Sequence, residues 1–230
     1  MAVTVQGLNA FGGGSAYRYF ADDFSTYANA AAMALSGNYT TFGVSRRNIV
    51  VTGTPGLRFD VAAAVGGGSG LLIPTKVTAA LNRSQFSQFK VLANNGTGAN
   101  TTRPSIWCFT TGLPSQVNNN LTGYCVEIRN NTPDARLVKS EGGIVAGQPT
   151  TNTLLLALTL PALGVLVRLE ARKVVRIGMD NIDFEVFYDG VSQGTASDTA
   201  IGFGLPGFGT HASDATGSAF EIGSFAAGVL

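Results

Sequence analysis

The stretch VLVRLEARKVVRIGMDNIDFEVFYDG, residues 165–190, contains two runs in which apolar and polar side chains alternate, and it ends in a turn signal. One face of the first run carries Val165, Val167, Leu169 and Ala171, and one face of the second carries Ile182, Phe184, Val186 and Tyr188. A period of two places successive side chains on opposite faces of a strand, so each run predicts a strand with one buried face. The closing Asp189-Gly190 predicts a tight turn, because glycine accepts positive φ without steric cost and aspartate tolerates it.

The charges on the other face of these runs suggest how the two strands pair. If they are antiparallel neighbours, placing Arg172 opposite Glu185 also places Arg168 opposite Asp189. A shift of two residues would set Glu170 against Glu185 instead, and like charges directly opposite each other destabilise a strand pair. We therefore predict the first register.

The composition predicts one all-β domain. Of 230 residues, 30 are glycine and 13% are charged, which is about half the usual charged share. Short apolar runs alternate with turn sequences such as Thr54-Pro55-Gly56 and Asn94-Asn95-Gly96. Many short strands at close spacing are typical of an antiparallel two-sheet sandwich. No internal repeat or linker divides it, so we expect one domain over residues 21–230.

The individual elements are predicted from the same patterns. Residues 26–35 are rich in alanine, the best helix former, and predict one short helix near the N-terminus with Ser25 or Thr26 as its cap. Besides the two runs above, strands are expected over residues 48–52, 56–62, 76–80, 86–93, 106–110, 124–129, 135–139, 153–158, 201–203 and 220–226.

The net charge and the pattern of apolar segments predict which partners and which cell compartment to expect. The net charge of +1 at pH 7 gives no electrostatic reason to expect nucleic acid or an anionic membrane as a partner. The N-terminus has no basic leader or apolar signal core, and the most apolar stretch, residues 154–169, is interrupted by Pro161 and Gly164. We therefore expect a protein made in the cytoplasm without a signal peptide or membrane span.

Residues 1–20 have the character of an N-terminal arm. Three glycines at positions 12–14 precede Tyr17, Arg18, Tyr19 and Phe20. Aromatic side chains and arginine are favoured at buried interfaces, so these four residues are candidates for binding a protein partner. The alternative is that they form a first strand on the domain's own sheet.

Several motifs occur in an order found in a known superfamily. They are Asp22-Asp23-Phe24 before the alanine-rich segment, GLRFD at 56–60, YCVEI at 124–128, VRLEA at 167–171, FEVFYDG at 184–190 and FEIGSFAAG at 220–228. Over residues 21–230 the chain resembles the concanavalin A-like lectin/glucanase superfamily, in the laminin-G-like form of many bacteriophage virion proteins. The resemblance implies an antiparallel jelly roll of two stacked sheets.

Members of that superfamily include lectins, glycoside hydrolases, adhesion modules and phage capsid-decorating or tail proteins. The arm, the low charge and the missing signal favour the last group. We therefore expect a non-enzymatic virion structural protein, a capsid decoration (cement) or tail-associated subunit. It would contact capsid or tail proteins of the same particle and form a homo-oligomer. The alternative is a lectin-like module that binds host or environmental glycans.

The sequence predicts no catalytic residue, metal or cofactor. The superfamily's glucanases use a Glu-x-Asp-x-Glu strand, but here Asn181 replaces the first glutamate before Asp183 and Glu185. His211, the only histidine, has no nucleophile motif beside it. The acids Asp180, Asp183, Asp189, Asp198 and Asp214 match no compact calcium loop.

Trp107 and the two cysteines each allow two interpretations. Trp107 is the glycan-stacking candidate, with Tyr39 or Phe208 as loop alternatives, yet its neighbours Ile106, Cys108 and Phe109 favour a strand buried on both faces. Cys108 and Cys125 lie in neighbouring predicted strands, so a disulfide is geometrically possible, but two buried thiols are the preferred interpretation.

Overall fold

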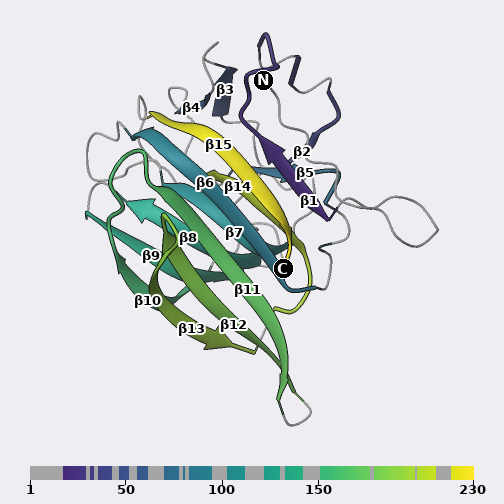
Figure 1. The fold of residues 1–230 in the computed structure, drawn as a ribbon, viewed down its shortest axis with the longest axis vertical. Coiled ribbons are helices and arrows are strands. Elements are labelled where there is room, and N and C mark those ends of the chain that lie inside the picture. The colour runs from purple at the N-terminus through teal and green to yellow at the C-terminus, as the bar shows by residue number, and fades with distance from the viewer. Residues whose placement is uncertain are drawn as a thin grey trace, which may run out of the picture.

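The computed structural model describes residues 18–29, 32–33, 36–42, 47–51, 56–61, 70–77, 80, 83–94, 103–111, 122–129, 133–141, 151–176, 179–199, 201–210 and 219–230. In this part of the chain, the strands form two antiparallel sheets that pack face to face (Figure 1). The predicted two-sheet sandwich is therefore confirmed. No helix among these residues is long and apolar enough to cross a membrane.

Among the described residues, one sheet has eight strands, in the order β13-β12-β11-β6-β15-β4-β3, with β1 also pairing with β15. Its strands are β1 (Tyr19–Asp22), β3 (Arg47–Val51), β4 (Leu57–Val61), β6 (Gln85–Asn94), β11 (Leu166–Arg176), β12 (Met179–Tyr188), β13 (Val191–Asp198) and β15 (Ala219–Val229). The segment expected to be the arm thus ends in β1, a strand on the domain's own sheet.

The other sheet has seven strands in the described part of the chain, in the order β10-β9-β8-β7-β14-β5-β2. Its strands are β2 (Tyr39–Phe42), β5 (Gly70–Pro74), β7 (Pro104–Thr111), β8 (Thr122–Arg129), β9 (Asp134–Glu141), β10 (Thr151–Thr159) and β14 (Leu205–Thr210).

The facing sides of the two sheets bury a single large core. Val167, Leu169 and Ala171 of β11 are fully buried, as the alternation in the first run predicts. Phe184 and Val186 of β12 are at most 1% exposed, in agreement with the second run. Burying such side chains is worth about 1.5–3 kcal/mol each for the larger ones, which makes this core the main source of stability.

The turn predicted at Asp189-Gly190 is confirmed. Tyr188 pairs with Val191, so Asp189 and Gly190 form a two-residue hairpin loop. Their φ angles are 47° and 82°. Positive φ at both positions is the geometry of the type I′ turn, whose twist matches that of the flanking strands.

The register predicted for β11 and β12 is wrong. Glu170 lies opposite Glu185, and Arg172 lies opposite Asp183. Arg176 pairs with Met179, so residues 177–178 connect the two strands. The predicted register would also leave a two-residue connection, residues 178–179, so loop length does not decide between the two registers.

The like charges at Glu170 and Glu185 are compensated within β11. Arg168 Nε donates to one carboxylate oxygen of Glu170 at 2.8 Å, and Arg172 donates to the other. Both arginines are two residues away on the same strand and so share its outer face. The prediction counted charges across the strands and left out these neighbours along the strand.

Three of the predicted elements differ from the structure. Among the described residues near the predicted helix, 32–33 are helical, with bonds from Met33 N to the Asn29 carbonyl and from Ser36 N to the Ala32 carbonyl. Asn29 Oδ1 accepts from Ala32 N and caps this turn, in place of the predicted cap. Residues 76–77 are not a strand, and β5 precedes them. Residues 201–203 are irregular, and β14 begins just after them. β13 was not predicted, because VSQGTASD is polar throughout.

Asp22 ties the end of β1 to the seven-stranded sheet. Its Oδ2 accepts hydrogen bonds from the hydroxyls of Tyr27 (2.7 Å) and Tyr39 (2.8 Å), and its Oδ1 accepts one from the Phe24 backbone. Burial and the hydrogen bond to Asp22 raise the pKa of Tyr27 to about 12, so this phenol remains a donor at neutral pH. The Asp22-Asp23-Phe24 motif thus has a structural role.

Gln85, fully buried on the inner face of β6, makes a second tie between the sheets. Its Nε2 donates to the carbonyls of Ala80 and Gly204, each at 3.2 Å, and its Oε1 accepts from Phe109 N at 3.1 Å. The pairing of β7 is irregular here, and Phe109 has a φ of 51°. Gln85 therefore satisfies backbone groups that the sheet leaves without a ladder partner.

Replacing Gln85 with leucine is expected to lower the free energy of unfolding by about 2–4 kcal/mol. The leucine keeps the buried volume, but the Phe109 N–H and the Gly204 carbonyl lose their partner, at roughly 1–3 kcal/mol for each unsatisfied group. Urea denaturation of both proteins measures the change. Gln193→Leu, at an exposed contact on β13, is the control, and an equal effect of the two substitutions would contradict this role of Gln85.

Candidate functional site

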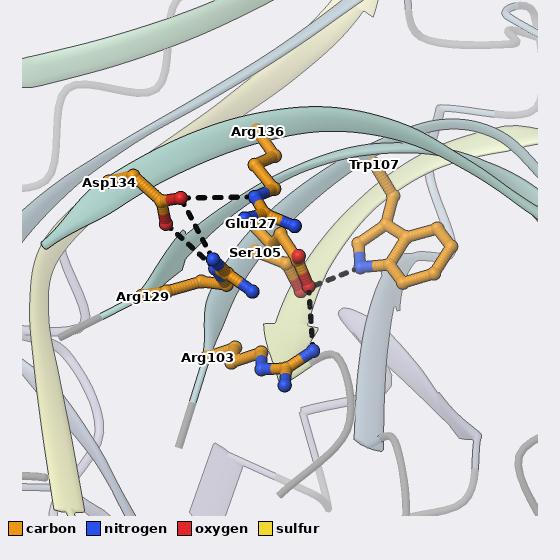
Figure 2. Close-up of polar contacts among 7 residues, drawn as sticks. All are labelled: Arg103, Ser105, Trp107, Glu127, Arg129, Asp134 and Arg136. Atoms are coloured by element: carbon orange, nitrogen blue, oxygen red, sulfur yellow. Dashed lines mark hydrogen bonds and ion pairs between the residues drawn. The ribbon is translucent and has the colours of Figure 1, made fainter. Parts of the chain in front are cut away.

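The outer face of the seven-stranded sheet carries a group of charged and polar side chains. Ser105 of β7 pairs with Glu127 of β8, and Glu127 pairs with Arg136 of β9. One step further, Arg129 pairs with Asp134. The group, here called the polar cluster, consists of Arg103, Ser105, Trp107, Glu127, Arg129, Asp134 and Arg136 (Figure 2).

The local sequence explains why these side chains share a face. In β8 the residues Tyr124, Val126 and Ile128 point into the core, so the alternate residues Glu127 and Arg129 point outward. In β9 the buried inner residues lie between Asp134 and Arg136 in the same way. The side chains of the polar cluster lie on the concave side of the curved strands (Figure 2).

Arg129 and Asp134 form the rigid part of the cluster. Arg129 Nε donates to Asp134 Oδ1 at 2.7 Å and its Nη2 donates to Oδ2 at 2.8 Å. Arg136 Nε adds a third hydrogen bond, to Oδ2, at 3.0 Å. The hydrogen bonds from Arg129 hold the pKa of Asp134 below its ordinary value. Two parallel bonds between a guanidinium and a carboxylate fix both groups in one plane.

The second part of the cluster is more deeply buried. Glu127 is 3% exposed, and Arg103 Nη1 lies 3.4 Å from its Oε2. Trp107 is fully buried and donates through Nε1 to Ser105 Oγ at 2.8 Å. The indole packs with Ile73, Cys125 and Val138 in a small apolar cluster. Trp107 therefore supports the polar cluster from the side and offers no ring surface to a ligand.

Three side chains of the cluster remain accessible. The exposed fractions of the Arg103, Asp134 and Arg136 side chains are 26%, 29% and 35%. Within the described residues, Arg136 uses only Nε for bonding, and the buried Nε of Arg103 has no hydrogen-bond partner. The terminal nitrogens of Arg136, which is held through its Nε, can therefore be offered as donors to a polar ligand. No group of three or more His, Cys, Asp or Glu side chains in the described part of the chain could hold a metal ion.

The described members of the predicted partner-binding set lie elsewhere, at and just before β1 of the eight-stranded sheet. Tyr17 is outside the described residues. Arg18 and Tyr19 are exposed, and the Tyr19 ring is tilted against Phe86 with centroids 6.0 Å apart. Phe20 faces the core and makes an edge contact with Tyr39 at 5.4 Å. Partner binding by Tyr17, Arg18, Tyr19 and Phe20 stays a prediction.

Burial excludes glycan stacking on Trp107, in agreement with the preferred interpretation of a strand buried on both faces, and on the two loop alternatives. Trp107 and Phe208 are fully buried, and Tyr39 is 9% exposed. Tyr39 and Phe208 are not in loops: they lie in β2 and β14, with their rings 5.8 Å apart. A sugar ring cannot stack on any of the three, because each one already packs against the protein's own side chains.

The two cysteines are free thiols, as preferred from the sequence. Trp107, not Cys108, is the register partner of Cys125. Cys108 belongs to the main core, whereas Cys125 belongs to the small cluster with Trp107 on the other face. Burial raises the pKa of both thiols well above the usual range. They point to opposite faces of the sheet and so cannot bond to each other.

Three of the acids considered for catalysis or calcium binding have structural contacts in the described part of the chain. Asp183 pairs with Arg176 at 2.5 Å, Asp189 Oδ1 accepts from Leu166 N, and Asp198 accepts from the Tyr124 hydroxyl. Asp183 and Glu185 lie on the outer face of β12, beside each other on one sheet rather than across a scissile bond. His211 and Asp214 are outside the described residues.

Solved structures with this fold are similar over most of the chain. The exoplasmic/lumenal domain of VIP36, in a Ca²⁺/Man2-bound form, has a TM-score of 0.55 at 9% identity, covering 93% of this chain and 88% of that one. The legume lectin-like domain from Entamoeba histolytica has a TM-score of 0.52 at 12% identity, with 86% and 92% covered. The carbohydrate-binding module CBM66 from Bacillus subtilis has a TM-score of 0.50 at 12% identity, with 81% and 94% covered.

These similarities define the class of fold. The protein is an antiparallel jelly-roll sandwich of the concanavalin A-like, legume-lectin-like kind, as the sequence motifs implied. No protein-family model matches the chain. No curated protein matches it either. Its structural neighbours are lectin-like and carbohydrate-binding domains.

Asp134→Asn is expected to lower the free energy of unfolding at about pH 7 by roughly 2 kcal/mol, because Arg129 loses a charged partner. The pKa of Asp134 is lower in the folded chain than in the unfolded chain. Its stabilisation is therefore complete above about pH 4 and is lost as the pH falls through the folded-state pKa. The difference between the two proteins should accordingly shrink below about pH 4.

Urea denaturation at about pH 7, 5 and 3 tests this dependence. Asp183→Asn is the matched control, because the Arg176 partner of Asp183 is 56% exposed. Pairs of that kind contribute about 0–1 kcal/mol. An Asp134→Asn difference that stayed constant from about pH 7 to about pH 3 would contradict the assigned ion pair.

Proposed function

We propose that the protein is a non-catalytic carbohydrate-binding module and that glycan binds at the polar cluster. The observation that carries the proposal is the fixed, partly exposed set of Arg103, Asp134 and Arg136 on the concave face. The solved structures with a similar fold support the proposal of carbohydrate binding: one is described as a carbohydrate-binding module, and another was solved in a Ca²⁺/Man-bound form. This was the alternative prediction from the sequence.

The geometry of the cluster suits hydroxyl-rich ligands. Guanidinium and carboxylate groups are planar and present adjacent hydrogen-bonding atoms at a fixed spacing. The bidentate bond between Arg129 and Asp134 holds Asp134 in place, and Asp134 in turn holds Arg136. A ligand that meets side chains already held in one conformation loses less entropy on binding.

Arg136→Ala should weaken glycan binding by about tenfold to a hundredfold, the equivalent of the roughly 1.5–3 kcal/mol of a hydrogen bond to a charged group. A glycan array identifies the ligand, and calorimetry measures both affinities. Arg176→Ala, at an exposed position on the eight-stranded sheet, is the control and should bind as the wild type does. The proposal fails if no glycan binds saturably, or if both variants bind equally well.

A second candidate function is that of a structural subunit acting through protein contacts. Leu92, Leu160, Leu163 and Val191 are 37–64% exposed. Two hydrogen bonds bring their segments to one end of the sandwich: Gly164 N donates to the Val91 carbonyl at 2.8 Å, and the Tyr188 side-chain hydroxyl donates to the Thr159 carbonyl at 2.8 Å. Grouped exposed aliphatic side chains are a feature of protein interfaces.

In this second function the protein would be the predicted virion subunit, a homo-oligomer in contact with capsid or tail proteins. If the end of the sandwich that carries these exposed aliphatic side chains mediates self-association, Leu163→Asp should convert the oligomer to a monomer. The substitution places a charge in an interface from which water is excluded. Sedimentation or light scattering measures the mass, and Val175→Asp, at a 78% exposed position on the β11–β12 hairpin, is the control. A wild-type monomer at high concentration would refute self-association through this end.

A further inference from the structure

We infer that the polar cluster selects acidic saccharides, in which the sugar carries a carboxylate or sulfate group. The inference rests on the proposed function and specifies the chemistry of its ligand. It follows from two properties of the cluster, its balance of charges and its balance of hydrogen-bond donors and acceptors.

Positive charge exceeds negative charge in the cluster. It holds three guanidinium groups, of Arg103, Arg129 and Arg136, and two carboxylates, of Glu127 and Asp134. Arg129 is neutralised by its two hydrogen bonds to Asp134. Arg136 shares that same carboxylate through Nε alone, so most of the surplus charge lies on its guanidinium, the most exposed of the three accessible groups.

The accessible hydrogen-bonding atoms are donors. Both oxygens of Asp134 already accept hydrogen bonds from arginine. The Ser105 hydroxyl oxygen accepts one from Trp107. Within the described residues, the two terminal nitrogens of Arg136 make no hydrogen bond, and its side chain is the most exposed of the cluster. A guanidinium has no acceptor atom, so the ligand must supply acceptors.

Neutral and acidic sugars meet this requirement differently. A hydroxyl brings one donor for every oxygen, and at an all-donor site its proton needs another partner. A carboxylate or sulfate brings acceptor oxygens only and can take two parallel bonds from one guanidinium. Arg103, which directly precedes β7, and Arg136 of β9 lie on either side of Glu127 of β8. Strands two apart in a sheet are separated by about 10 Å. An oligosaccharide with acidic groups on successive units could therefore reach both.

The test compares ligands that differ only in charge: a galacturonic acid oligosaccharide against its methyl ester, and a sulfated galactose disaccharide against the unsulfated one. Calorimetry in about 50 and about 300 mM NaCl should give at least about tenfold tighter binding of one acidic form, with a smaller advantage at high salt. Binding of the carboxylate pair, the sulfate pair or both identifies the anion that is accepted.

Two variants connect the preference to the site. Arg136→Gln should reduce the affinity for the acidic saccharide to that for the neutral one. Arg136→Lys should retain part of the preference, because lysine keeps the positive charge but lacks the planar pair of guanidinium donors. Arg172→Gln, with a side chain 53% exposed on the eight-stranded sheet, is the control. If acidic and neutral forms bind within about twofold, the inference is overturned while glycan binding stands. If no saccharide binds, both fail.

Discussion

The burial of the inner face of the seven-stranded sheet is the constraint on which the rest depends. Ile106, Val126 and Leu137 lie on adjacent strands, and each is fully buried. Because side chains alternate, holding these three in the core places their neighbours on the outer face. A slip of one residue would move charged side chains into the core. The same apolar packing that stabilises the sandwich therefore assembles Glu127 and Arg136 into one row.

Although the chain has few charged residues, several of them are buried together on the outer face of the seven-stranded sheet. Glu127 and Arg129 are 3% and 8% exposed, and buried charges cost free energy unless they are paired. Arg129 meets this cost with a bidentate bond to Asp134. The resulting arrangement is rigid, and rigidity is what a binding site needs if it is to distinguish ligands by the placement of their acceptors.

The error in the β11–β12 register shows where sequence reasoning about strand pairs is weak. Cross-strand charge pairs contribute only about 0.2–1 kcal/mol, and Arg168 and Arg172 compensate Glu170 along its own strand. Both registers leave a two-residue connection, so the length of the loop does not decide between them either. β13 was missed for a related reason: its polar sequence carries no burial signal, and it forms because the Asp189-Gly190 turn folds it back on β12.

The all-β class, the strands β11 and β12, the turn between β12 and β13, and the buried state of Cys108 and Cys125 could all be predicted from the sequence. These are local properties, since they follow from alternation, glycine conformation and side-chain polarity. That Arg103, Glu127 and Asp134 come together follows from the three-dimensional fold alone, because strand pairing joins positions that are apart in the chain. The fold also decided that Trp107 is covered, since the exposure of a side chain depends on everything packed around it.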